Sequence, residues 1–457
     1  MFFLFFLLSS NRKSAPARMP KLCRSPAEGL PRFSWSEVRS HRTAGDHWIV
    51  LRDKVYDVST LRHPGGDVIY THAGEDATDV FGTIHPASAF AMLDHYLIGR
   101  VASGRSRRDA LIEADFRAMR AQLTREGVFR ASAPYYLLQL ATTVALWCVS
   151  VWLLAFEGVA AFLCSAVLLA LFWQQSGWLA HDVLHHQVFA NRRVGEVAGM
   201  FVGNLFQGYS AAWWKDKHNT HHAVTNVARG ARGARGARDP DIDTLPLLAW
   251  SVGLARGAAR DASAVGRLLM RYQAVTYLPM LAIARLSWLA QSLRHALGDI
   301  PYGDVEISMI MGHYAVYAWM LSHFSPLGAL GYVAVSQCAC GLMLASVFGI
   351  GHNGMAVVDD WAKRPTTFVE QQVLATRNIA HGAFADWFTG GLSYQIEHHL
   401  FPTCPRHSLP RVAERTRALC AKHGIAYTCT GFVEGTVDVL AHLARVTDAL
   451  RTEFPAL

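Results

Sequence analysis

Long apolar stretches alternate with polar segments through the second part of this chain. Five of these stretches approach the roughly 20 residues that a helix needs to cross the hydrocarbon core of a membrane. A soluble protein would disperse so many apolar residues. The pattern therefore predicts an all-α, polytopic membrane domain over residues 132–457, with apolar stretches at Tyr135–Phe156, Val159–Trp173, Tyr272–Leu293, Ile307–Phe324 and Leu327–Ile350.

Polar residues inside and between these stretches indicate which of them cross. Only Glu157-Gly158 separates the first two, so we expect a hairpin that returns to its starting side. Arg285 and Gln291 interrupt the third stretch, and a central arginine is costly in hydrocarbon. We expect this stretch to lie in the membrane interface, and the glycine-rich segment 194–212 to return without crossing. About four transmembrane helices remain, with cytosolic helices between them.

Segment 33–101 has a different pattern, with short β-like runs such as Trp48–Leu51 in place of long apolar stretches. It contains His63-Pro-Gly-Gly66 and then His85. The proline presets a tight turn, and the two glycines let the backbone approach a flat cofactor closely. Two imidazoles, one from each side of a pocket, would fill both axial positions of a haem. Such a haem carries electrons and does not bind oxygen.

Two further segments flank this soluble domain. Residues 1–30 form an N-terminal extension whose apolar start has no basic segment before it and no convincing cleavage site after it. We therefore expect no cleaved signal peptide, with translation from Met19 as an alternative. Residues 105–131 are rich in Arg, Glu and Ala. Helical spacing of their apolar residues predicts an amphipathic linker helix at the membrane surface, and these residues are Leu111, Phe116, Met119 and Leu123.

Composition agrees with a membrane protein that carries a soluble portion. Of the 457 residues, 51% are hydrophobic, and the mean hydropathy is +0.16. The net charge of +8 suits anionic lipid headgroups or the cytosolic face of a membrane. We expect no nucleic acid partner, because no basic stripe with interleaved aromatic residues is present. The eight cysteines show no paired Cys-x-x-Cys spacing, which indicates reduced thiols in a cytosol-facing protein.

A triplet repeat of Gly, Ala and Arg occupies Arg229–Arg238. Nothing apolar anchors it, so we interpret it as a flexible, solvated insertion. Binding of lipid or nucleic acid is the alternative, and we assign the repeat no function.

Every His-His pair lies in one of three clusters, and imidazole is a ligand for iron, zinc and copper. Residues three or four apart share one face of a helix, so each cluster can present several side chains to one metal site. One zinc uses about three or four protein ligands, so eight histidines indicate two metals in one pocket. The clusters are His181, His185 and His186, then His218, His221 and His222, and finally His398 and His399 after Gln395.

A haem on the same chain narrows the choice of metal. Zinc is redox-inert and has no use for a tethered electron source, which disfavours a zinc hydrolase or transporter. Iron with dioxygen can attack unreactive C–H bonds. Dioxygen takes four electrons on reduction to two waters, of which the C–H bonds donate two and an external carrier donates the others.

The soluble segment resembles cytochrome b5, and we delimit that domain as residues 31–104. By this resemblance His63 and His85 are the axial ligands of haem b, whereas His72 and His95 are ordinary surface residues. The matching text is His63-Pro-Gly-Gly66, Ala73–Thr78 with Asp79 and Phe81, and Tyr96–Arg100.

The whole chain resembles the front-end fatty acid desaturases, in which cytochrome b5 precedes the membrane domain and the third histidine cluster begins with Gln. The resemblance implies a multi-domain protein, with a small α+β haem domain followed by an all-α polytopic desaturase domain. Beyond the clusters, the matching text is Gln174–Trp178, Trp213–Lys217, Asp239–Asp243, His352–Met355 and Asp386–Gly391.

This resemblance implies a di-iron site and an oxygen-dependent reaction. All eight clustered histidines become iron ligands, with Gln395 at or near the site. His352 is either a further ligand or a helix-capping or core residue, and His381 is a weaker candidate. Asp182 and Glu397 would orient ring nitrogens and would not bind iron.

At two positions the residue differs from the one usual in this family. Ser393 stands where Asn is usual, and Gly351 stands where relatives often carry Asn. Either change would weaken a hydrogen bond behind the ligands, but neither removes a predicted ligand.

Front-end enzymes insert a cis double bond between the carboxyl end of an acyl chain and an existing double bond. The implied substrate is a long-chain polyunsaturated fatty acyl chain, carried by coenzyme A or in a phospholipid. The texts at 213–222 and 388–392 look most like Δ6 enzymes of eighteen-carbon chains, although Δ5, Δ4 and Δ8 relatives share them. A sphingolipid long-chain-base Δ8 desaturase and a non-enzymatic haem carrier with a membrane anchor are the alternatives.

The expected electron donor is NADH-cytochrome b5 reductase, because no dinucleotide-binding fingerprint is evident in this chain. The expected location is the endoplasmic reticulum membrane, in several passes, with the haem domain and the histidine clusters facing the cytosol. No local motif reports the double-bond position, the acyl carrier or the oligomeric state.

Overall fold

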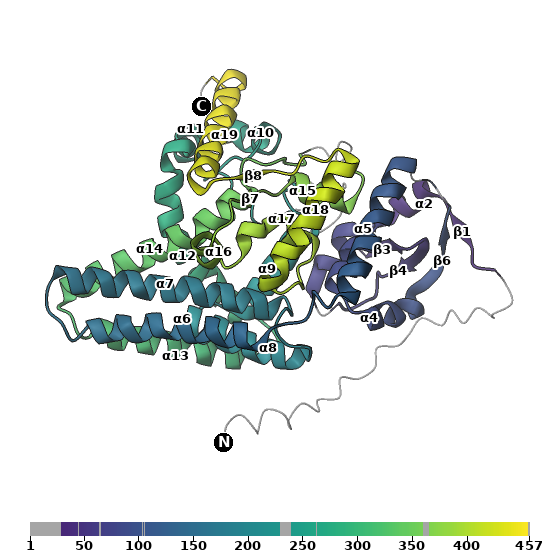
Figure 1. Cartoon of the computed structure of the whole chain (residues 1–457). Coiled ribbons are helices and arrows are strands. Elements are labelled where there is room, and N and C mark those ends of the chain that lie inside the picture. Colours follow the sequence, from purple (N-terminus) through teal and green to yellow (C-terminus); the bar gives the residue numbers. More distant parts are fainter. Residues whose placement is uncertain are drawn as a thin grey trace.

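The computed structural model consists of a small soluble domain and a larger helical domain (Figure 1). It describes residues 29–43, 45–63, 65–102, 104, 106–228, 239–261, 263–359 and 365–455. Residues 1–28 of the expected N-terminal extension, the Gly-Ala-Arg repeat and Pro64 lie outside the described residues.

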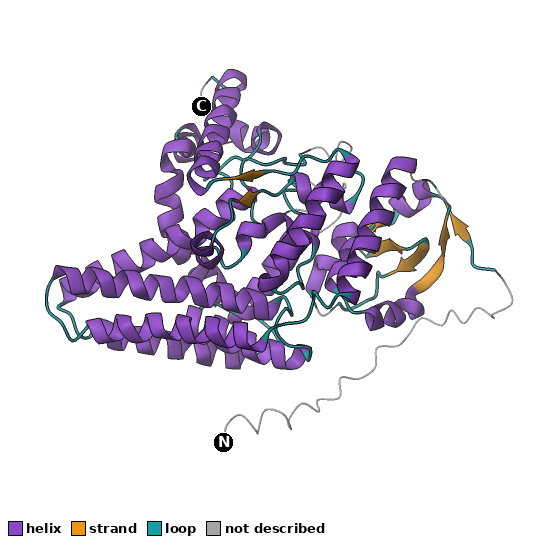
Figure 2. Ribbon diagram, viewed as in Figure 1, coloured by secondary structure: helices purple, strands orange, loops and turns teal. Residues whose placement is uncertain are grey.

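The first domain is an α+β unit built on one sheet (Figure 2). Its strand order is β1-β6-β4-β3-β2, with β5 beside β3. Arg52 and Asp53 join β3 to β4 with φ of 56° and 79°, as a two-residue hairpin turn requires. The elements are β1 (Arg32–Phe33), α2 (Trp35–Ser40), β2 (Arg42–Thr43), β3 (Asp46–Leu51), β4 (Lys54–Asp57), η1 (Gly66–His72), β5 (Glu75–Asp76), α3 (Thr78–Ile84), α4 (Ala87–Met92), η2 (Leu93–Tyr96) and β6 (Leu97–Val101).

The linker helix α5 (Arg107–Arg125) begins where the Ser106 hydroxyl accepts a hydrogen bond from the Asp109 amide. Three of the four spaced apolar residues are buried, but Leu111 is 53% exposed, and Ile112 takes the inward position. The buried face packs in a core formed with α17 (Gln395–Leu400) and α18 (Leu409–His423). Protein therefore covers this apolar face, which is not free to enter a membrane.

Long helices pack side by side in the membrane domain (Figure 1). By length and composition, α6 (Ala133–Leu153), α7 (Val159–Leu184) and α14 (Pro326–His352) can cross a membrane. The helix α13 (Gly303–Leu321) packs beside them but has Asp304 and Glu306 in its first turn. Of the four stretches expected to cross, three thus correspond to described helices that are long and apolar enough to do so. The predicted hairpin between α6 and α7 turns at Gly158, where φ is 108°.

The helix α12 (Gln273–Ala296) carries the arginine that suggested an interfacial position. Arg285 is fully buried, and its guanidinium donates to the Gln207 carbonyl at 3.0 Å. The same group lies over the rings of Trp173 and Tyr209, 4.3 Å and 5.0 Å from their centroids. The arginine thus points into protein, where a carbonyl and two aromatic faces stabilise its charge.

Segment 194–212 reverses direction, in agreement with its expected return. Helix α8 (Arg192–Met200) continues as the π-helix η3 (Phe201–Gln207), and Gly208, with φ of 81°, turns the chain into α9 (Ala211–Ala223). The remaining elements are α10 (Val252–Asp261), α11 (Ala264–Arg271), α15 (Phe368–Leu374), β7 (Asn378–Ile379), α16 (Ala383–Phe388), η5 (Leu392–Tyr394), η6 (Arg406–Ser408), β8 (Cys429–Thr430) and α19 (Phe432–Glu453).

Candidate active site

Two histidines of the soluble domain lie close together. The rings of His63 and His85 have centroids 5.8 Å apart. His85 Nδ1 donates to the Phe81 carbonyl at 3.1 Å, which leaves Nε2 free to bind a metal. Burial lowers the pKa of His63 and lowers that of His85 to about 4, so both rings are neutral at pH 7. This spacing suits two axial ligands of one haem iron, because an imidazole–metal bond is about 2 Å long.

Four buried histidines at the end of the helix bundle form a first group. Their ligand nitrogens all lie within 4.8 Å of one another, and the Nε2 atoms of His181 and His398 are 3.1 Å apart. Helix periodicity explains part of this, because residues four apart share one face. The group, called group 1, comprises His181 and His185 at the end of α7, His218 on α9 and His398 on α17.

Three more buried histidines form group 2, again with their ligand nitrogens within 4.8 Å: His221, His352 and His399. Each ring donates its Nδ1 hydrogen to an oxygen outside the group, so each Nε2 carries a lone pair. The acceptors are Asp239 for His221 at 3.0 Å, the Ala375 carbonyl for His352 at 3.3 Å and Gln372 for His399 at 2.9 Å.

His222 joins the two groups. Its Nε2 lies 3.1 Å from Nε2 of both His218 and His398, in group 1. Its ring stacks on that of His399, in group 2, with centroids 4.2 Å apart. Gln395 lies beside group 2, and its amide is 2.6 Å from Nε2 of His352.

Although His221 is buried, the carboxylates of Asp239 and Asp241 raise its pKa. Five other histidines outside the membrane-spanning helices are held in the neutral form. Burial, followed by the charges of neighbouring rings, places their pKa values well below the ordinary value. Neutral imidazole is the form that binds metals. Ring nitrogens that converge in this form offer their lone pairs to metal cations. These residues are His185, His218, His222, His398 and His399.

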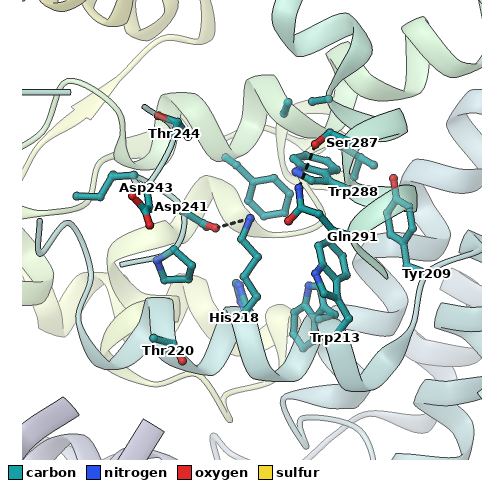
Figure 3. A pocket seen from close by; sticks show the side chains of 18 of the residues that line it. Tyr209, Trp213, His218, Thr220, Asp241, Asp243, Thr244, Ser287, Trp288 and Gln291 are labelled. Carbon is teal, nitrogen blue, oxygen red and sulfur yellow. Dashed lines mark hydrogen bonds and ion pairs between the residues drawn. The ribbon is translucent and has the colours of Figure 1, made fainter. Parts of the chain in front are cut away.

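A cavity of about 1280 Å³ extends from the histidine groups between α12 and α14. His181, His218 and His352 line it near the groups. Figure 3 shows Trp288 and Tyr209 on one side of the cavity and Asp241, Asp243 and Thr244 on the other. Such a space, mostly apolar and leading to a buried metal-binding centre, suits a long hydrocarbon chain.

Comparison with known proteins matches both parts of the chain. A model of the fatty acid desaturase family covers residues 157–431, and one of the cytochrome b5-like heme/steroid binding domain covers residues 34–102. The chain belongs to the fatty acid desaturase family. This confirms the expected front-end desaturase with a fused cytochrome b5 domain, and it confirms an enzyme in place of an anchored haem carrier.

The relatives of this desaturase differ in the reaction that their names state. An acyl-lipid (9-3)-desaturase of Physcomitrium patens is 40% identical over 91% of this chain and 78% of its own. A Δ8-fatty-acid desaturase of Euglena gracilis is 35% identical over 86% of this chain and 94% of its own. A Δ6-fatty-acid desaturase of Caenorhabditis elegans is 31% identical over 89% and 96%, respectively.

The expected cofactors of the desaturase agree with these findings. Its cytochrome b5 domain binds haem, and the histidine groups suit the two irons of this family. With O₂ as co-substrate, bound iron supplies an oxidant strong enough to break C–H bonds. The protein's own contribution is to hold the imidazoles in place beside a mostly apolar cavity.

Apart from His222, which contacts both groups, His186 is the one clustered histidine that belongs to neither group. Helix α7 ends at Leu184, and His186 then adopts a φ of 59°. Its Nδ1 has no hydrogen-bond partner among the described residues, and burial lowers its pKa to about 4. The geometry does not support the prediction that His186 binds iron.

Of the two carboxylates expected to orient ring nitrogens, one fits and the other does not. Asp182 Oδ1 lies 3.5 Å from Nδ1 of His181, and its other oxygen pairs with Arg406, so its orienting role fits. Glu397 accepts hydrogen bonds from Asn378 and Tyr427, and among the described residues no histidine donates to it. Burial raises the pKa of Glu397. Its predicted contact with a ring nitrogen is therefore wrong.

Asp239 and Gln372 hold ring nitrogens but were not predicted to do so. Asp239 is fully buried and also accepts from the backbone amides of Asn226 and Asp241, at 2.7 Å and 2.8 Å. The Asp239–Asp243 text indicated this segment without assigning it a role. Gln372 lies in α15, where no sequence pattern set it apart.

The two unusual positions have local explanations. The Ser393 hydroxyl donates to Asp386 at 2.6 Å, so it has a partner of its own. A side chain at Gly351 would begin 3.2 Å from Cγ of Gln395, so this glycine lets Gln395 approach group 2. Gly351 also belongs to a Gly-x-Gly-x-x-Gly spacing at 349–354. This spacing lies at the end of the helix α14 and not after a strand, so it is not a dinucleotide-binding fingerprint. His381 stacks on Tyr394 outside both groups.

Replacing Asp239 with asparagine is expected to lower iron content or turnover by roughly 10- to 100-fold, because the carboxylate fixes the ring of His221. Iron analysis of the purified protein and a desaturation assay would measure this, with the haem spectrum as a check on folding. Asp299→Asn is the matched control, since it makes the same change at an exposed position outside the histidine groups and the cavity lining. Full iron and activity in Asp239→Asn would contradict this role.

Proposed function

We propose that this desaturase inserts a Δ6 cis double bond into long-chain polyunsaturated acyl chains. The observation that carries the proposal is the mostly apolar cavity that leads to both histidine groups. The texts at 213–222 and 388–392 support Δ6 chemistry, as does the Δ6 relative from Caenorhabditis elegans. The Δ8 relative from Euglena gracilis supports Δ8 desaturation as the second candidate.

In this proposal, group 1 binds one iron and group 2 binds the other, with His222 between them. Gln395 stays beside group 2 and adjusts the position of the His352 ring. The haem held by His63 and His85 receives electrons from NADH-cytochrome b5 reductase and delivers them one at a time. The protein resides in the endoplasmic reticulum membrane, with its haem domain and histidine groups on the cytosolic side.

A fatty-acid profile tests this function. Cells without polyunsaturated fatty acids would express the full chain, receive linoleic or α-linolenic acid, and be analysed by gas chromatography. We expect a new Δ6 product that the His398→Ala variant does not make. Product only from Δ8 substrates would overturn the Δ6 assignment. Altered long-chain bases with unchanged acyl chains would instead favour the sphingolipid alternative.

A further inference from the structure

The cavity has a polar part and an apolar part. Its apolar part lies between α12 and α14 and includes Leu281, Ala284, Trp288, Leu344 and Phe348. Its polar part includes Asp216, Lys217, Asp241, Asp243 and Thr244. An acyl chain would occupy the apolar part, because burial of its methylene groups is favourable. The polar carrier of that chain is thereby directed to the polar part.

The polar part lies directly beside the histidine groups. Lys217 precedes His218 in the chain, and it pairs with Asp241 at 3.2 Å, the ion pair drawn from Asp241 in Figure 3. Asp241 also lies 3.6 Å from Nδ1 of His221. Front-end chemistry requires this proximity, because few carbons separate the carrier from the reacting carbons.

The haem domain forms a wall of this same polar part. Gly66, Asp67 and Val68, at the start of η1, line the cavity together with residues of α9. A methyl group added at Gly66 would lie 3.5 Å from Oδ1 of Asp216. Asp67 itself is exposed, so its carboxylate is available to a bound molecule.

Contacts outside the cavity hold the haem domain in this position. Arg117 of the linker helix forms two hydrogen bonds with Asp79, at 2.7 Å and 3.0 Å. Arg192 of α8 donates to the Ile84 carbonyl at 2.9 Å, next to the haem ligand His85. The wall at Asp67 is therefore a fixed part of the folded chain.

We propose that the haem domain is part of the substrate site, and that Asp67 faces the phosphate-bearing carrier of the acyl chain. The proposal rests on the proposed function only in requiring an acyl substrate, and not on the position of the double bond. It gives the fused domain a second role besides electron delivery. The shared chemistry is a phosphate group, whether in coenzyme A or in a phospholipid headgroup.

A binding experiment that needs no turnover tests this role. Dibromostearoyl-coenzyme A, and in a second arm dibromostearoyl phosphatidic acid, would be titrated in detergent micelles while the bromines quench tryptophan fluorescence. Trp213, Trp214 and Trp288 line the cavity and report occupancy by the chain. Asp67→Lys replaces a charge that repels phosphate with one that attracts it. The Kd for the probe is therefore expected to fall about fivefold at low salt, a change within the range of exposed charge pairs. High salt should remove the difference.

Asp94→Lys is the matched control, because it makes the same charge change at an exposed position of the same domain away from the cavity. A shift in one arm identifies the carrier and supports the proposal. Unchanged Kd in both arms, or an equal shift in Asp94→Lys, would overturn it. If Asp67→Lys loses its haem spectrum, Asp67→Asn decides the question, with a smaller decrease in Kd expected. Since the probe is saturated, failure of the Δ6 assignment would not affect these results.

Discussion

Replacing His222 with alanine is expected to disturb both metal-binding groups at once and to lower desaturation by more than about 100-fold, beyond the loss typical of a residue that only orients a ligand. The reason is its position, with Nε2 3.1 Å from two rings of group 1 and a ring stacked on His399 of group 2. Iron per protein should fall together with activity, whereas the haem spectrum should stay normal.

His186→Ala is the matched control for this experiment. It removes a histidine from the same kind of His-His pair, but from outside both groups. We expect iron content close to that of the unchanged protein. Loss of iron in His186→Ala, with full iron in His222→Ala, would show that the two groups are assigned wrongly.

The contrast between His185 and His186 shows what helical spacing can predict and what it cannot. Helical spacing predicts that His181 and His185 share a face, and they do. The next residue is turned by about 100° around a helix, and here α7 has already ended, so His186 points elsewhere. A run of adjacent histidines does not by itself reveal this, because the end of the helix decides it.

The three clusters predicted most of the histidines that the structure brings together, but not their division into two groups. Group 2 includes His352 from the end of α14. His221 also belongs to group 2, whereas its neighbour in the chain, His222, contacts His218 of group 1. Asp239 and Gln372 act through contacts between segments far apart in the sequence. Such pairings depend on tertiary packing, which local spacing does not report.

The fold was predictable to a similar degree. The cytochrome b5 motifs and the long apolar stretches predicted both domains and the hairpin of α6 and α7. The linker α5 was expected at the membrane surface because the spacing of its residues reveals an apolar face but not its partner. The residues of α18 that cover this face lie far along the chain. Arg285 suggested an interfacial helix because its partners, Trp173 and the Gln207 carbonyl, belong to other elements.

Replacing His85 with alanine is expected to remove one axial ligand of the haem and to stop electron delivery to the desaturase domain. Both rings of the pair are neutral, and the hydrogen bond from His85 Nδ1 to the Phe81 carbonyl fixes the orientation of this ring. Alanine offers no ligand, so the purified variant should lose most bound haem or show an altered absorption spectrum. Reduction by NADH and cytochrome b5 reductase should fail in parallel.

The control variant and the iron content decide what such a loss means. His95→Ala removes a histidine of the same domain that lies outside the facing pair, and its spectrum should match that of the unchanged protein. His85→Ala should keep its iron, because the histidine groups belong to the other domain. Iron lost along with haem would indicate that the haem domain is needed to fold the iron site. A normal haem spectrum in His85→Ala would instead refute the axial assignment.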